Sequence, residues 1–272
     1  MSTDVSKTER RTELRPEDER QLRIAYAKLE NPSFAARLTS VIGTPVERAI
    51  ETLPDALADG IQRAARLSIE RVMKLALSSA PVGGRTVAGD GIHKAFAIGT
   101  GAVGGLFGLP GLMVELPVTT AVMMRSIADI AAEFGEDPGD EATRLACVEV
   151  FALGGRSRED DAAESGYYGL RVALAMEVSA VTRQSSSAVM GLVRAVASRF
   201  GVVVTDKVAL QWVPVVGALG GAALNAVFIQ HFQDMARGHF IMRRLEREYG
   251  REVVRAAYHG IASPVPDRNS AD

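Results

Sequence analysis

The stretch AIGTGAVGGLFGLPG, residues 97–111, decides the fold, because its glycines allow two opposite interpretations. Gly99, Gly101 and Gly104 have the Gly-x-Gly-x-x-Gly spacing of a dinucleotide-binding loop. Such a loop follows a strand and opens a helix, and the helix N-terminus faces the pyrophosphate. Here further helix breakers follow within seven residues: Gly105, Gly108, Pro110 and Gly111. An interior glycine costs a helix about 1 kcal/mol and a proline about 3 kcal/mol. We therefore expect no helix of useful length to start there, and no nucleotide at Gly99–Gly104.

Two apolar runs still need an explanation once a nucleotide loop is set aside. The first, 95–114, is twenty residues without a charge, and the second, 208–233, carries no charge if His231 is neutral. Twenty residues can span hydrocarbon, but irregular backbone inside hydrocarbon leaves polar groups without partners. The residues that interrupt these runs are Gly99, Gly101, Gly104, Gly105, Gly108, Pro110, Pro214, Gly217, Gly220 and Gly221. We expect them either to allow close packing of buried segments, or to shape segments that dip into one membrane leaflet or hold an acyl chain.

Composition and charge place the chain among globular proteins rather than nucleic-acid binders. Its 272 residues are 47% hydrophobic and 24% charged, which is ordinary for a globular protein. A net charge of −2 gives no basic footprint for DNA or RNA. The single cysteine, Cys147, excludes an internal disulfide and indicates a reducing compartment. The N-terminus is charged and lacks the apolar core of a signal peptide, so we expect a cytoplasmic protein.

Helical periodicity runs through most of the chain. Pro16 followed by three acids marks a helix start. Apolar residues at helical spacing predict further helices over 55–79, 112–134, 139–153, 166–184 and 186–200. The best strand candidate, 201–207, is short. We therefore predict an all-α fold, with a single multi-helix domain packed around the two Gly/Pro-interrupted apolar segments. The domain is expected to cover 16–260, between a disordered tail at 1–15 and a flexible tail at 261–272.

Basic residues flank the two apolar runs. They are Arg63, Arg66, Arg71 and Lys74 before the first run, and Arg243, Arg244 and Arg247 after the second. Basic flanks beside apolar runs favour the anionic cytoplasmic leaflet. The alternative is a solvated helix face with ordinary ion pairs between neighbouring turns. We expect association with the inner face of the cell membrane, with membrane lipid or a membrane protein as the partner.

The sequence shows no catalytic or metal-binding constellation. It has no Gly-x-Ser-x-Gly, His-Glu-x-x-His, P-loop or Cys-x-x-Cys motif. His231 and His239 are eight residues apart, about 12 Å along a helix axis, which is too far for one metal ion. His231 and Asp234 could supply two metal ligands, or a base with its orienting carboxylate, although this spacing is common on helices. Cys147 is expected in the core. We predict no catalytic residue, metal or cofactor.

Some polar residues stand in apolar surroundings: Glu115, Arg125, Asp129 and Asn225. A buried carboxylate needs a partner or a helix N-terminus. Glu115 precedes Pro117, and an acid near a helix start satisfies free N–H groups. Alternatively, Glu115, Arg125 and Asn225 line a polar spot in an apolar cavity. The structural role is favoured, because buried polar groups usually satisfy one another. These four residues, with His231 and Asp234, are the candidate ligand or polar-cavity residues.

Four blocks of sequence, in this order, resemble the EcsC protein family. They are TGAVGGLFGLPGLMVELPVTTAVMMRSIADIAAEFGEDP, LACVEVFALGGRSREDDAAESGYYGLR, WVPVVGALGGAALNAVF and LEREYG, within residues 20–255. The resemblance implies a bacterial, largely helical, membrane-associated or cytoplasmic protein without a settled activity. We expect a non-enzymatic, membrane-associated protein that binds lipid or a membrane-protein partner at the cytoplasmic face. The alternative is a peptidase-like hydrolase with a site near Glu115 or His231.

Overall fold

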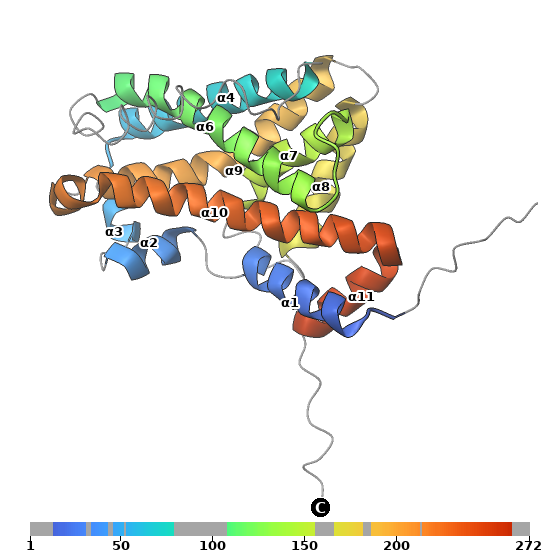
Figure 1. The fold of residues 1–272 in the computed structure, drawn as a ribbon. Coiled ribbons are helices and arrows are strands. Elements are labelled where there is room, and N and C mark those ends of the chain that lie inside the picture. Colours follow the sequence, from blue (N-terminus) through green and yellow to red (C-terminus); the bar gives the residue numbers. More distant parts are fainter. Residues whose placement is uncertain are drawn as a thin grey trace, which may run out of the picture.

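The computed structural model describes residues 13–30, 34–42, 46–51, 53–78, 108–155, 166–181, 186–212 and 214–262. Within these ranges the chain forms ten helices and no strand (Figure 1). The helices are α1 (Pro16–Glu30), α2 (Phe34–Ile42), α3 (Val46–Glu51), α4 (Asp55–Leu77), α6 (Gly108–Glu133), α7 (Glu141–Leu153), α8 (Gly166–Val181), α9 (Ser186–Trp212), α10 (Pro214–Tyr249) and α11 (Arg251–Ala262).

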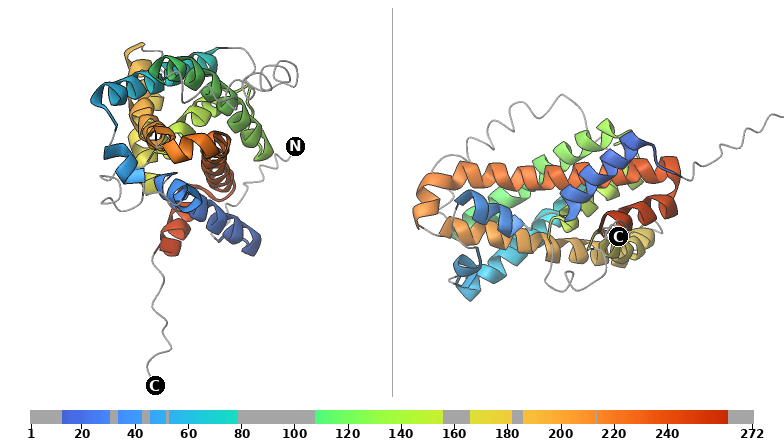
Figure 2. Two further views of the ribbon diagram at one scale, coloured as in Figure 1. Left: turned by 90° about the vertical axis from the view of Figure 1, so that its left-hand side faces the viewer. Right: turned by 90° about the horizontal axis from the view of Figure 1, so that it is seen from below.

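The helices form one packed domain around α10. α10 is 36 residues long and crosses the middle of the bundle (Figure 1). α4 and α6 pack together along one side, and α1 and α11 lie on the opposite side, as the end-on view also shows (Figure 2). α9 packs against α4, α7, α8 and α10. The prediction of a single all-α domain is confirmed.

Local sequence explains where several helices begin and end. α1 begins at Pro16 with three acids in its first turn, as expected for the positive end of a helix. The Asp140 side chain caps α7 by accepting a hydrogen bond from the Thr143 backbone N–H at 3.3 Å. α6 and α10 are followed by glycines with positive φ, +77° at Gly135 and +89° at Gly250. This conformation carries little penalty for glycine, so both helices stop there.

Two sequence-based expectations differ from the structure. Residues 201–207, the best strand candidate, continue α9 as a helix. α6 begins at Gly108, although its glycines and prolines argued against a helix start. Pro110 lies in the first turn, where its missing N–H would have no helical partner in any case. Pro117 lies inside the helix, so only one backbone hydrogen bond is lost there. Of the glycine motif, Gly99–Gly105 lie outside the described residues.

Four phenylalanine rings fill the centre of the bundle where α7, α9 and α10 meet. Phe151, Phe200, Phe228 and Phe232 are fully buried. Their ring centroids are 5.4 Å apart for Phe151–Phe200 and 5.2 Å apart for Phe228–Phe232. Phe34 from α2 joins the cluster with its centroid 5.7 Å from that of Phe228. Aromatic pairs at this spacing contribute about 0.5–1.5 kcal/mol beyond the area that they bury.

Two described helices are long and apolar enough to cross a membrane. They are Pro110–Glu133 and Ser187–Gln211, with mean hydropathies of 1.2 and 1.5. Neither coincides with the runs singled out in the sequence. Of these, 95–114 lies mostly outside the described residues, and 208–233 divides between the end of α9 and the first part of α10. The core helix of a soluble protein can meet the same criterion, so exposure and charge must decide what these helices do.

Gly155 offers a test of how closely α7 and α9 approach each other. A Cβ at Gly155 would lie 1.9 Å from the backbone carbonyl oxygen of Arg199. We expect Gly155→Ala to lower the free energy of unfolding by about 3 kcal/mol, because backbone cannot move aside cheaply. Urea titration followed by circular dichroism measures the change. The control is Gly169→Ala in α8, where no atom lies within 4 Å of the added Cβ. Equal stability of the two variants would contradict the close approach.

Candidate functional site

Glu115 forms an ion pair with a lysine that the sequence analysis did not single out. The Lys207 side chain on α9 is only 4% exposed, and its Nζ lies 3.8 Å from Glu115 Oε1 on α6. The same Nζ lies 4.7 Å from the centre of the Phe228 ring on α10. Burial lowers the pKa of Lys207, and the Glu115 carboxylate opposes that shift. Because α6 begins seven residues earlier, Glu115 lies within the helix and not at its start.

The other members of the predicted polar spot lie in different surroundings. Asn225 is buried on α10, one turn from Phe228, and its Oδ1 has no hydrogen-bond partner within the described parts of the chain. Arg125 is half-buried and Asp129 is exposed, both further along α6 than Glu115. The structure supplies Lys207 as the basic partner of Glu115, a residue outside the predicted polar spot.

His231 and Asp234 do not pair with each other. The Nε2 of His231 lies 2.9 Å from the carbonyl oxygen of Gly154, and its Nδ1 has no hydrogen-bond partner among the described residues. Asp234 instead accepts hydrogen bonds from Lys28 at 2.6 Å and Arg37 at 2.8 Å. These contacts fasten α1 and α2 to α10. His231 and Asp234 therefore do not have the geometry of a general base with its orienting carboxylate.

The two groups of basic residues have different environments. In the second group, Arg243 binds Glu136 through two hydrogen bonds of 2.9 and 3.0 Å, and Arg247 also contacts Glu136. Arg244 binds the buried Asp18 at 3.1 Å. These three arginines therefore hold neighbouring segments against α10. The first group, on α4, is exposed: Arg63, Arg66, Arg71 and Lys74.

α6 leaves an apolar stripe exposed beside α4. Val114 is 70% exposed and Val118 is 38% exposed. Only 33% of the apolar window of this helix is buried. α4 packs directly against α6 and adds the exposed Leu67 between its basic residues. We call this surface, composed of the exposed α4 residues 63, 66, 67, 71 and 74 with Val114 and Val118, the α4–α6 face.

A buried polar cluster links α7, α8 and α10, and the sequence analysis missed most of it. His239 on α10 is fully buried, and its Nδ1 lies 3.1 Å from the Tyr167 hydroxyl on α8. Its Nε2 has no hydrogen-bond partner in the described structure and lies 3.9 Å from Glu149 Oε2 on α7. Burial raises the pKa of Glu149 to about 6, against the positive charges of Arg171 and Arg243. We call Glu149, His239 and Tyr167 the α7–α10 cluster.

Ion pairs surround this cluster. Arg171 binds Glu246 at 2.7 Å, and the Tyr168 hydroxyl donates to the same carboxylate at 3.2 Å. Arg171 also lies over the Tyr167 ring, 5.4 Å from its centre. A signal for this cluster was present in the sequence, because Glu149 interrupts the apolar run LACVEVFAL. His239, ninety residues away, could not be matched to it without the fold.

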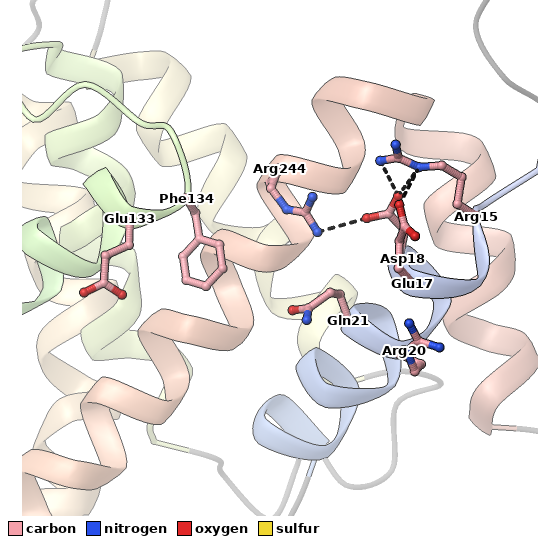
Figure 3. Close-up of a pocket in the computed structure, with 8 residues that line it drawn as sticks. All are labelled: Arg15, Glu17, Asp18, Arg20, Gln21, Glu133, Phe134 and Arg244. Carbon is pink, nitrogen blue, oxygen red and sulfur yellow. Dashed lines mark hydrogen bonds and ion pairs between the residues drawn. The ribbon is translucent and has the colours of Figure 1, made fainter.

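An open pocket of about 450 Å³ lies between α1, the end of α6 and α10 (Figure 3). Two of the arginines that line it, Arg15 and Arg244, bind the carboxylate of Asp18 at 2.7 and 3.1 Å. The Tyr249 hydroxyl donates to Asp18 at 2.6 Å. These contacts fix α1 on α10, and we assign the pocket a structural role.

The comparison with protein families agrees with the resemblance seen in the sequence. A family model described as the EcsC protein family matches residues 47–245. The chain belongs to the EcsC protein family. The match spans the chain from α3 to most of α10. The part shared with the EcsC family therefore contains the α4–α6 face, the Lys207–Glu115 pair and the α7–α10 cluster. No curated protein and no solved structure matches the chain.

His231 gives a pH prediction for this EcsC-family chain. Burial lowers the pKa of His231 to about 4, against the hydrogen bond to Gly154. Between about pH 6.5 and pH 4, this histidine therefore binds a proton in the unfolded chain but not in the folded chain. The contribution of His231 to stability is therefore full above pH 6.5 and is lost as the pH falls towards 4.

We expect His231→Gln to remove about 2 kcal/mol of the stability loss between pH 7 and pH 5. Urea titrations of both proteins at several pH values measure it. Glu149 and His239 are present in both proteins, so their effects on the pH dependence cancel in the comparison. An unchanged pH slope in the variant would show that His231 is charged in the folded chain at pH 5.

Proposed function

We propose that this EcsC-family protein is a non-enzymatic protein that associates with the cytoplasmic face of the cell membrane through its α4–α6 face. One observation carries the proposal: an apolar, largely uncovered helix lies beside a helix with an exposed basic surface. Interfacial helices with this combination bury their apolar side chains at the headgroup boundary while the basic groups meet anionic lipid.

Charge and exposure favour this side of the molecule. Between Arg63 and Lys74, four basic residues stand against one acid, Glu70. Glu70 pairs with Arg66 at 2.9 Å. Within the described residues Arg63, Arg71 and Lys74 have no carboxylate partner, so they are the residues that we expect to meet an anionic surface. The arginines of α10 are less suited to lipid, because Glu136 and Asp18 already bind them.

The positions of Val114 and Val118 favour a shallow contact with the membrane surface. α6 carries Glu115 within its apolar part, and this carboxylate is paired with Lys207. An arrangement in which α6 lies along the surface buries Val114 and Val118 without breaking that pair. The proposal is therefore a surface contact, in which membrane lipid is the partner and no helix needs to leave the bundle.

The basic residues provide the first test. We expect the triple variant Arg63→Glu, Arg71→Glu and Lys74→Glu to bind vesicles of anionic lipid about a hundredfold more weakly, because each basic residue near such a surface contributes about 1 kcal/mol. Co-sedimentation with vesicles at low salt measures the partition, and binding should fall as salt is added.

The matched control reverses three exposed arginines on the other side of the bundle. Arg23→Glu, Arg251→Glu and Arg255→Glu give the same change in net charge on α1 and α11. This control should bind as the unaltered protein does. Equal losses in both triple variants would mean that net charge, and not the α4–α6 face, controls binding.

The valines provide the second test. Val114→Ser with Val118→Ser should weaken vesicle binding about tenfold at high salt, where the charges are screened and apolar burial remains. The control is Val172→Ser with Met176→Ser on α8, residues that are 66% and 72% exposed. Loss of binding in the α8 variant alone would place the contact on α8 and overturn the proposed orientation.

A further inference from the structure

The two buried histidines of α10 differ in what fixes their tautomer. The Nε2 of His231 meets the carbonyl oxygen of Gly154, which can only accept a hydrogen bond. His231 must therefore carry its hydrogen on Nε2 when it is neutral. The Nδ1 of His239 meets the hydroxyl of Tyr167, which can donate or accept. The tautomer of His239 is therefore decided by the group that its other ring nitrogen, Nε2, contacts.

That second nitrogen faces a carboxyl group across a short gap. His239 Nε2 is buried without a hydrogen-bond partner in the described part of the chain, and Glu149 Oε2 lies 3.9 Å from it. The distance exceeds that of a hydrogen bond by about 1 Å. The His239 side chain is 0% exposed and that of Glu149 is 13% exposed, so little water competes for either group. A buried nitrogen of this kind normally has a partner.

We infer that Glu149, His239 and Tyr167 form a proton-operated tautomer switch between α7, α8 and α10. With Glu149 ionised, the Nε2–H of His239 points at the carboxylate and the Tyr167 hydroxyl donates to Nδ1. When Glu149 takes up one proton, its hydroxyl donates to Nε2, and the hydrogen on Nδ1 then donates to the Tyr167 oxygen.

The proton count balances. Before uptake the three groups hold two exchangeable hydrogens, one on Nε2 and one on the phenol. After uptake they hold three, on the Glu149 carboxyl, on Nδ1 and on the phenol. The added proton comes from solvent, and the imidazole stays neutral in both states.

The surrounding charges place this event at mildly acidic pH. Among the described residues, the charged groups that act on Glu149 come from α8 and α10, and they are Arg171 and Arg243. Both are held by other carboxylates, Arg171 by Glu246 and Arg243 by Glu136. Burial raises the pKa of Glu149 to about 6 despite them. Burial, with the same two arginines, lowers the pKa of His239 well below its ordinary value. The proton therefore stays on the carboxyl and not on the ring.

The switch links protonation to helix packing. The new hydrogen bond from Glu149 to His239 requires the two side chains to approach by about 1 Å. α7 and α10 are in direct contact, so the new hydrogen bond joins two neighbouring helices. The switch is independent of membrane binding, because neither Glu149 nor His239 belongs to the α4–α6 face.

Nitrogen NMR of histidine tests the inference on the full chain. With ¹⁵N-labelled histidine, long-range proton–nitrogen spectra show which ring nitrogen carries the hydrogen. Between pH 7.5 and pH 5 we expect the hydrogen of His239 to move from Nε2 to Nδ1, with a midpoint near pH 6. His231 serves as the internal control and should keep its hydrogen on Nε2. A constant His239 pattern over this range, or its conversion to imidazolium, would overturn the switch.

Glu149→Gln separates the switch from a merely structural role. The glutamine amide does not titrate, so the position of the hydrogen on His239 should no longer change between pH 7.5 and pH 5. A variant that still shows the midpoint near pH 6 would exclude Glu149 as the titrating group. If this variant fails to fold, the spectra of the unaltered protein decide by themselves. The signals are assigned by their loss in His239→Gln and His231→Gln.

Discussion

The arrangement of the bundle depends on ion pairs that the second half of α10 makes with the segments around it. Asp234 holds α1 and α2, Arg244 holds α1 again, Arg243 holds the segment after α6, and Glu246 holds α8. Each contact joins segments that are far apart in the sequence. A charge buried without its partner costs several kcal/mol, so each neighbour has one favourable position against α10.

These ion pairs give the basic residues of α10 and α4 different roles. By sequence, the arginines of α10 and those of α4 are equivalent flanks of apolar segments. In the fold, the α10 arginines bind internal carboxylates, while the basic residues of α4 face solvent beside an uncovered apolar helix. A membrane contact is therefore best supported on one side of the bundle, opposite α1 and α11 (Figures 1 and 2). Membership of the EcsC family does not by itself assign an activity. The proposed membrane contact is supported by the exposed residues of the α4–α6 face.

The interior contains polar groups that the ion pairs do not satisfy. Lys207 reaches Glu115 only at 3.8 Å, and His239 faces Glu149 at 3.9 Å. Both pairs lie between helices that are packed mainly through hydrophobic side chains. In the low dielectric of the interior, the pKa values of such loosely paired groups depend strongly on their neighbours. The α7–α10 cluster differs from the Lys207 pair because a neutral imidazole there can pass hydrogen bonding from one nitrogen to the other.

The sequence by itself determined the all-α class, most helix ranges and the EcsC family, because helical periodicity and capping are local properties of the chain. It misjudged the start of α6, since the cost of glycine and proline was counted without the packing that offsets it. Only the tertiary structure decided which charges meet, because those partners lie far apart along the chain: Lys28 and Asp234 are 206 residues apart. For the same reason Glu115 was recognised but its partner Lys207 was not, and His239 gained its importance only beside Glu149. Residue spacing describes one helix face, whereas a site between helices exists only once the helices have packed.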